Sequence, residues 1–304
     1  MYTESVEMVE VSPRDGLQNE KTLISTTDKI ALVERAIAAG ARRIEVTSFV
    51  NPKAVPQMAD AEAVCAGLPW RNDVTYIGLV MNARGAARAI DTGRIDQLGA
   101  VAVATDTFAR ANQGQTSDGS VAAAQEIIAM ARQAGKTGQV TIAAAFGCPF
   151  EGEVAEDRVV AMALALAEAD PVEIGLADTI GVGNPAHVIS LVGKIRAAVP
   201  RIPVRVHFHN TRGTGLANVW AAIGAGAVSV DAAIGGLGGC PFAPGAAGNV
   251  STEDVAYMLE RARIGTGLNL PALVAANHWL GSVMDRTLPG MVAKAPPFPK
   301  PAQA

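Results

Sequence analysis

Short apolar runs rich in Val and Ile recur along the chain and alternate with longer segments rich in Ala. A short apolar run bounded by Gly, Pro or charged residues is typical of a buried strand. The pattern therefore predicts eight strands, at Val6–Val11, Arg43–Val46, Val74–Val80, Leu98–Val103, Val140–Ala145, Val172–Ala177, Val204–Phe208 and Val228–Ala232.

The segments between these runs carry apolar residues at helical spacing. Between residues 29 and 39, for example, Ile30, Val33 and Ile37 stand three or four positions apart. Gly40 follows, and glycine commonly ends helices. The same spacing predicts further helices at Ser120–Ala134, Val154–Ala169, Pro185–Ala198, Gly213–Ala225, Thr252–Ala262 and Pro271–Met284.

Eight strands that alternate with helices over about 250 residues are typical of a (β/α)₈ barrel. The competing layout is a doubly wound open sheet, which carries Gly-x-Gly-x-x-Gly after its first strand. Here residues 12–16 read Ser-Pro-Arg-Asp-Gly instead, which favours the barrel. We expect one α/β domain over residues 1–285, a TIM barrel with extra C-terminal helices, and an irregular tail rich in Pro and Ala over 286–304.

Composition excludes several classes of protein. With 304 residues, of which 49% are hydrophobic and 18% charged, the chain can build a large core, and its net charge of −4 argues against a nucleic-acid partner. Cys65, Cys148 and Cys240 are odd in number and not clustered, so we expect no disulfide framework. No secretory or transit signal and no membrane-spanning stretch is evident, so we expect a cytoplasmic protein without a membrane partner.

Unusual polar residues stand where the predicted strands end. In a barrel of this kind, catalytic groups lie at the carboxyl ends of the strands. The candidates, in strand order, are Arg14 and Asp15; Glu45 and Thr47; Asn82; Thr105 and Asp106; Cys148; Asp178 and Thr179; His207 and His209; and Cys240 and Asn249. The fold is thus expected to gather most of the candidate chemistry at one rim.

Two histidines point to a metal. His207 and His209 are two apart near the end of a strand, so both side chains project to the same face. Asp15 offers a charged oxygen and Asn249 a neutral one. Two nitrogens and two oxygens suit six-coordinate Mg²⁺ or Mn²⁺ better than Zn²⁺, whose structural sites are closed and often rich in thiolates.

Other residues could carry the catalytic steps. Arg14 would place five donors beside the metal, where a developing enolate oxygen needs them, although it could also be a surface cation. Cys240 lies in a glycine-rich loop that could close over the site and relay a proton, or it could be an inert buried thiol. Glu45 and Asp178 are each a candidate general base or a group that orients His or Arg14, and a salt bridge or helix cap is as plausible.

Together these motifs resemble the metal-dependent lyase and condensing-enzyme barrels, and among them the 3-hydroxy-3-methylglutaryl-CoA lyases. The likeness covers about residues 5–270. It is carried by residues 12–20, 44–50, 52–58, 147–152, 178–183, 236–241 and 248–254.

The resemblance implies a retro-Claisen cleavage of a 3-hydroxyacyl-CoA to acetyl-CoA and a keto acid, which is acetoacetate in the parent reaction. It implies Mg²⁺ or Mn²⁺ as cofactor, an acyl-CoA as small-molecule partner, and a homo-oligomer. The residues it assigns are Asp15, His207, His209 and Asn249 as metal ligands; Arg14, Cys240, Glu45 and Asp178 as catalytic groups; and Arg14, Gln18 and Thr179 as substrate-binding groups.

Three stretches depart from the pattern of these lyases near the substrate mouth. Residues 210–213 read Asn-Thr-Arg-Gly where Asp-Thr-Tyr-Gly is usual, residues 105–112 differ from the usual Ser-Glu-x-Phe, and Thr141 replaces a common aromatic. They leave open a lyase for another branched or longer 3-hydroxy-diacyl-CoA. A condensing enzyme or aldolase shares Arg-Asp and His-x-His, but the Gly-Gly-Cys-Pro loop favours a lyase, and the intact ligand set argues against a non-catalytic acyl-CoA binder.

Overall fold

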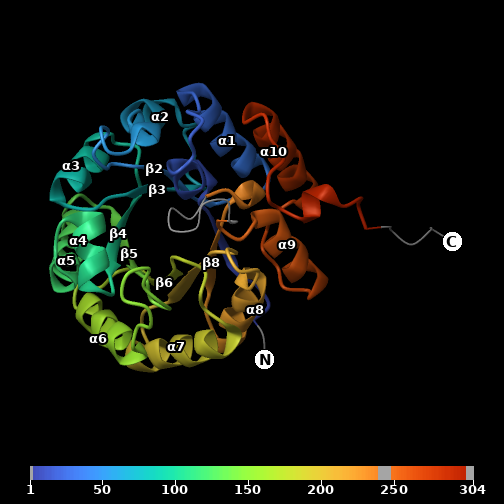
Figure 1. The fold of residues 1–304 in the computed structure, drawn as a ribbon. Helices are drawn as coiled ribbons and strands as arrows, with labels where there is room; N and C mark the ends of the chain where they lie inside the picture. Colours follow the sequence, from blue (N-terminus) through green and yellow to red (C-terminus); the bar gives the residue numbers. More distant parts are fainter. Residues whose placement is uncertain (1–2, 239–247, 299–304) are drawn as a thin grey trace.

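The computed structural model describes residues 3–238 and 248–298. Within these ranges, eight parallel strands form a closed barrel in which each strand pairs with the next and β8 pairs with β1. Figure 1 shows the strands inside a ring of helices. The strands are β1 (Glu7–Glu10), β2 (Arg43–Ser48), β3 (Thr75–Leu79), β4 (Gln97–Val103), β5 (Thr137–Ala143), β6 (Ile174–Asp178), β7 (Val204–Phe208) and β8 (Ser229–Ala232). Each overlaps one predicted run, and the predicted (β/α)₈ barrel is confirmed.

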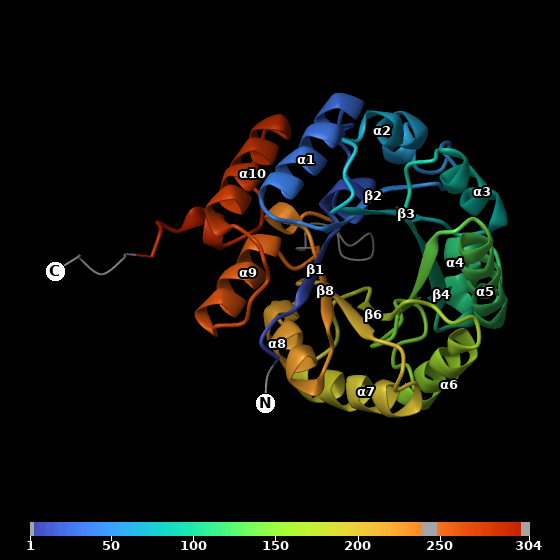
Figure 2. The ribbon, with the colours of Figure 1, turned by 180° about the vertical axis from the view of Figure 1, so that it is seen from behind.

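Helices cover the outside of the barrel and follow the strands in order. They are α1 (Thr26–Ala38), α2 (Ala61–Gly67), α3 (Ala83–Asp91), α4 (Asp106–Gln113), α5 (Ser117–Gln133), α6 (Glu156–Ala167), α7 (Pro185–Ala198), α8 (Gly215–Ala225), α9 (Thr252–Arg261) and α10 (Leu270–Val283). The extra helices α9 and α10 lie side by side beyond the ring, next to α8 and α1 respectively (Figure 2). None of the helices in the described part of the chain combines the length and the apolarity that crossing a membrane requires.

Helix α1 shows how local sequence sets the ends of an element. The Ser25 side chain accepts a hydrogen bond from the Asp28 backbone nitrogen, so the helix begins at Thr26, three residues before the predicted start at Lys29. Gly40 follows its end with a φ of +100°, and a Cβ there would lie 2.4 Å from the Gly267 carbonyl oxygen. Only glycine fits this turn, which confirms it as the predicted stop.

The barrel interior holds buried charged side chains, where branched apolar residues are more usual. Arg43 on β2 donates at 2.6 Å to Glu173, which directly precedes β6, and at 2.9 Å each to Gln97 and Gln139. Arg205 on β7 pairs with the same Glu173 at 2.8 Å. All five side chains are buried, and buried charge is tolerated because each group meets an opposite charge or a hydrogen-bond partner.

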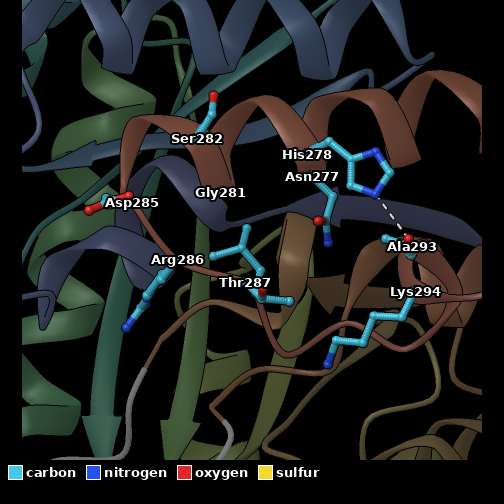
Figure 3. A pocket seen from close by; sticks show the side chains of 10 residues that line it. Asn277, His278, Gly281, Ser282, Asp285, Arg286, Thr287, Ala293 and Lys294 are labelled. Carbon is cyan, nitrogen blue, oxygen red and sulfur yellow. Dashed lines mark hydrogen bonds between the residues drawn. The ribbon is translucent and has the colours of Figure 1, made fainter.

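The first part of the tail packs on the barrel, whereas residues 294–298 are exposed. Within residues 286–298 it forms one short 3₁₀ turn, η4 (Val292–Lys294), and is otherwise irregular, as predicted. Leu288 is buried, and a Cβ at Gly235 would lie 2.4 Å from its side chain. An open pocket of about 570 Å³ lies between α10 and the tail, and Figure 3 shows its lining residues, which include His278, Arg286 and Lys294.

Candidate metal centre and active site

A single π-helical turn, η1 (Ser12–Gly16), follows β1 and carries the predicted Arg14 and Asp15. The Val11 carbonyl accepts from the Gly16 nitrogen at 3.1 Å, which closes the wide turn. Pro13 suits the start of the turn because it has no N–H to satisfy there. Isolated π turns are frequent at functional sites.

The turn brings Asp15 against both histidines at the end of β7. The Asp15 Oδ2 atom lies 3.8 Å from His207 Nε2 and 3.9 Å from His209 Nε2. One possible ligand atom from each of the three residues lies within 4.8 Å of the other two. These distances allow one ion to contact all three residues. The sequence predicts the histidine part of this arrangement, because two residues that are two apart on a strand project to the same face.

Asn249 joins this cluster through the segment that follows the eighth strand. It forms an isolated bridge with His209, supported by the Asn210 nitrogen, which donates to the Gly248 carbonyl at 2.7 Å. The Asn249 amide nitrogen donates to Asp15 Oδ2 at 2.8 Å and to the Leu237 carbonyl at 2.9 Å.

The donor set fits a divalent cation. Among the described residues, no group donates to the buried Asn249 Oδ1 atom. A buried carbonyl oxygen without a partner is costly, and a cation would satisfy it. Two imidazoles, a carboxylate and an amide oxygen are ligands that suit Mn²⁺ and similar divalent ions.

Gly238 leaves the space that Asn249 occupies. Its φ is +104°, and a Cβ there would lie 2.5 Å from Asn249 Nδ2. We predict that Gly238→Ala displaces Asn249 and weakens Mn²⁺ binding by about 10-fold or more, measured by EPR titration of free Mn²⁺. Gly267→Ala is the matched control, because Gly267 also has a positive φ but has nothing within 4 Å of its Cβ position. Equal affinity in both variants would refute this role of Gly238.

Arg14 is held between two carboxylates. Its Nη1 atom lies 2.5 Å from Asp15 Oδ1, and its Nε and Nη2 atoms each lie 2.5 Å from Glu45 Oε2. Burial alone would lower the pKa of Arg14, but the charges of Glu45 and Asp15 outweigh burial and raise it. The guanidinium is therefore a fixed cation beside the candidate metal ligands, and its catalytic role stays a prediction.

Neighbouring charges also shift the pKa values of two predicted metal ligands, Asp15 and His207. Burial alone would raise the pKa of Asp15, but the charge of Arg14 and the two histidines hold it well below its usual range. Burial alone would lower the pKa of His207, but its hydrogen bond to Asp231 and the charge of Asp15 raise it. Because only a neutral imidazole is a metal ligand, the raised pKa of His207 favours the form that does not bind a cation.

Asp178 lies fully buried at the end of β6. Its carboxylate accepts from the backbone nitrogens of Val182 and Gly183 at 2.9 Å each. Burial raises the pKa of Asp178, although the two backbone donors and the nearby histidines act to lower it. These contacts anchor the turn after β6 and are neither the salt bridge nor the helix cap that the sequence offered as alternatives. The catalytic role of Asp178 stays a prediction.

The predicted substrate-binding residues lie at the mouth of the barrel and are partly exposed. The Thr179 hydroxyl accepts from the Ala144 nitrogen at 2.9 Å, and Gln18 Oε1 accepts from the Ser48 hydroxyl at 3.0 Å. Their role toward a substrate stays a prediction. Cys240 lies outside the described residues, and its proposed proton relay also stays a prediction.

The other polar candidates at the rim have structural partners. Asn82 caps α3, Asp106 accepts from the Ser117 nitrogen, and the Thr105 hydroxyl donates to the Cys148 sulfur at 3.0 Å. In the described part of the chain, Cys65 and Cys148 are both free and buried, and burial raises the pKa of Cys65 to about 12. The Cys65 thiol therefore lacks the depressed pKa of a reactive cysteine.

Two buried carboxylates of the site were not predicted. Asp231 on β8 contacts His207 Nδ1 at 3.1 Å. Glu10 on β1 accepts from the Ser12 and Ile234 nitrogens and from the Thr252 hydroxyl, at 2.8 to 3.0 Å. The sequence did hold a signal for both residues, since each is an acidic residue inside a run predicted to be buried. A buried carboxylate needs a specific partner, so such a position indicates a structured polar contact.

Glu10 makes the stability of the fold depend on pH. Burial raises its pKa from 4.5 to about 7, so between these values the folded chain holds a proton that the unfolded chain has lost. The free energy of unfolding should therefore fall by about 3 kcal/mol from this group as pH rises through that window. Glu10→Gln keeps an oxygen that can accept from both backbone nitrogens but has no carboxylate that titrates. The free energy of unfolding of this variant, relative to that of the parent, should therefore rise by about 3 kcal/mol between pH 4.5 and 8.

Denaturant unfolding at several pH values tests this expectation. The control is Glu34→Gln, which changes an exposed carboxylate on α1. If Glu10→Gln and the parent showed the same pH dependence, the raised pKa would be wrong.

Comparison with known proteins decides the family. The model of the HMGL-like family matches residues 5–279. The chain belongs to the HMGL-like family. It is 42% identical to the (R)-citramalyl-CoA lyase of Chloroflexus aurantiacus, over 97% of this chain and 96% of the relative. It is 39% identical to the hydroxymethylglutaryl-CoA lyase YngG of Bacillus subtilis, over 95% and 96% respectively.

A solved structure agrees with this assignment. The HMG-CoA lyase of Acinetobacter baumannii, in complex with coenzyme A and 3-methylmalate, superposes with a TM-score of 0.91 at 40% identity, over 97% of this chain and 98% of that one. The HMGL-like family is a family of enzymes, and this chain is a lyase of that family.

Where the chain departs from the pattern expected of the HMGL-like family, the replacing residues make contacts of their own. Arg212 stands at the position of the usual tyrosine and donates to the Ile180 carbonyl at 2.6 Å and the Gly181 carbonyl at 3.2 Å. It thereby ties the loop after β7 to the loop after β6. Thr141, at the position of a common aromatic, accepts from Arg205 at 2.7 Å.

Proposed function

We propose that the protein is a divalent-metal-dependent carbon–carbon lyase that cleaves 3-hydroxy-3-methylglutaryl-CoA to acetyl-CoA and acetoacetate. The observation that carries the proposal is the direct contact between Arg14 and Asp15, which sets a fixed cation beside a cluster of metal-ligating groups. Retro-Claisen cleavage needs both features, since one end of the substrate must lose a hydroxyl proton while the other develops an enolate.

Mg²⁺ or Mn²⁺, held by Asp15, His207, His209 and Asn249, would supply a Lewis acid that makes the 3-hydroxyl more acidic and holds the substrate carboxylate. A base takes the hydroxyl proton, the C2–C3 bond breaks, and its electron pair moves to C2. C3 becomes the ketone carbon of acetoacetate. The enolate of acetyl-CoA remains and gains a proton at C2.

Arg14 is assigned to the enolate oxygen, because its guanidinium is charged, rigid and already in place before charge develops. Glu45 is the better-placed candidate for the base. Burial raises its pKa, and its Oε1 atom stands outside the contact that Oε2 makes with Arg14. Both Asp178 oxygens are already bonded to backbone nitrogens. Cys240 is the proposed source of the C2 proton.

(R)-Citramalyl-CoA is a second candidate substrate. The Chloroflexus aurantiacus relative that is 42% identical is named as a lyase for it. Its acyl group is one methylene shorter, so the same bond cleavage would give acetyl-CoA and pyruvate. Arg212 ties together the loops after β6 and β7, where a difference in the acyl group would be recognised. Thr141 lies deeper in the barrel than expected, level with Arg205, which it contacts.

A panel of 3-hydroxyacyl-CoA substrates, incubated with Mg²⁺ and analysed by mass spectrometry for both products, tests the proposal. We expect acetyl-CoA and acetoacetate from 3-hydroxy-3-methylglutaryl-CoA. Acetyl-CoA and pyruvate from (R)-citramalyl-CoA alone would select the second candidate. Absence of cleavage across the whole panel would contradict a lyase acting on this class of substrate.

A further inference from the structure

Arg205 lies on β7 two residues before His207 and is almost completely buried. Its three nitrogen atoms lie close to three different partners. Nη1 donates to Asp231 Oδ2, Nη2 donates to the Thr141 hydroxyl at 2.7 Å, and Nε lies 2.8 Å from Glu173 Oε1. Because a guanidinium is planar, these contacts fix its orientation in the barrel.

The Arg205 guanidinium packs tightly against the backbone of β6. A Cβ at Gly175 on β6 would lie 2.9 Å from Arg205 Nη2 and 3.0 Å from the Thr141 hydroxyl oxygen. The guanidinium therefore fills the space that glycine leaves open. Displacing it would leave the buried carboxylates of Glu173 and Asp231 without its charge.

Asp231 links Arg205 to the candidate metal centre. The same Oδ2 atom that accepts from Arg205 also lies 3.1 Å from His207 Nδ1. A neutral imidazole has one N–H, so an Nδ1–H donated to Asp231 leaves the lone pair on Nε2. Nε2 is the atom of His207 that faces Asp15, at 3.8 Å.

We propose that Arg205 is a positioning residue of the metal centre: it fixes Asp231, which in turn holds the His207 ring so that Nε2 faces the ion. The inference rests on the proposed metal-dependent function. It assigns to Arg205 a role that Arg43, the other arginine of the barrel interior described above, does not share. Arg43 contacts Glu173, Gln97 and Gln139 but neither Asp231 nor His207.

The test is the binding of Mn²⁺ alone to the full-length, metal-free protein. We expect Arg205→Met to weaken Mn²⁺ affinity by about 10- to 100-fold, the usual cost of losing a group that orients a ligand. Electron spin-echo envelope modulation of the bound Mn²⁺ should also show one imidazole nitrogen fewer than in the parent. Arg43→Met is the matched control, because it removes a buried arginine that shares Glu173 and should leave both readouts unchanged.

Arg205→Lys keeps a positive charge in the barrel and covers the case in which the methionine variant does not fold. Lysine cannot reach all three partners at once, so affinity should fall part of the way and the nitrogen modulation should weaken. Parental affinity and modulation in a folded Arg205 variant would overturn the inference while leaving the metal centre intact. If the parent itself bound no Mn²⁺ through histidine, the proposed metal centre would fail, and the role of Arg205 with it.

Discussion

Arg14→Met should lower kcat for acetyl-CoA release by about two to three orders of magnitude. Loss of one preorganised donor at a developing oxyanion costs about 10²–10³ in rate, and Arg14 is the cation assigned to the enolate. Methionine has a similar length but no donor, so the loss measures the guanidinium. Steady-state kinetics with saturating Mn²⁺ gives kcat and KM separately.

Two further variants make the Arg14 experiment decisive. Arg14→Lys keeps the charge but loses the fork that contacts Asp15 and Glu45, so it should recover part of kcat. Arg88→Met removes a half-buried arginine that pairs with Glu62 outside the site, and should retain the parent kcat. An unchanged kcat in Arg14→Met would show that the enolate is stabilised by another group.

Asp15→Asn should weaken Mn²⁺ binding by more than about 100-fold and abolish cleavage at micromolar metal. Its carboxylate is the charged member of the cluster, and its pKa lies well below the usual range, so it is ionised at any working pH. Loss of a group that merely orients a ligand already costs about 10- to 100-fold, so loss of the charged ligand should cost more.

Activity measured against Mn²⁺ concentration tests the Asp15 prediction, and millimolar Mn²⁺ should restore part of the rate. The control is Asp106→Asn, which changes a carboxylate at the same rim that pairs with Arg110 and not with the histidines. A parental Mn²⁺ response in Asp15→Asn would remove Asp15 from the ligand set.

Strong local patterns made the barrel predictable. Strands such as Val204–Phe208 and helices such as Pro185–Ala198 were predicted with their observed bounds, because apolar runs and helical spacing are local signals. Helices α2, α3 and α4 were not given bounds, since they are only seven to nine residues long and so fall short of the window over which helical spacing is counted.

The candidate site was predictable to the extent that its geometry is local. The two-residue spacing on a strand was enough to bring His207 and His209 to one side. The place of Asn249 depends on a bridge to His209 across the barrel end. The sequence offered Asn249 as a candidate ligand after the last predicted strand, but did not encode that bridge. The contacts of Arg205 and Asp231 depend on how three strands pair, which no segment of sequence encodes alone.

Acetyl-CoA release from 3-hydroxy-3-methylglutaryl-CoA, measured in a coupled assay with and without EDTA, tests the central claim most directly. The account predicts that EDTA-treated protein releases no acetyl-CoA above the uncatalysed background, and that added Mg²⁺ or Mn²⁺ restores the rate. Release at the same rate by the metal-depleted protein would contradict it.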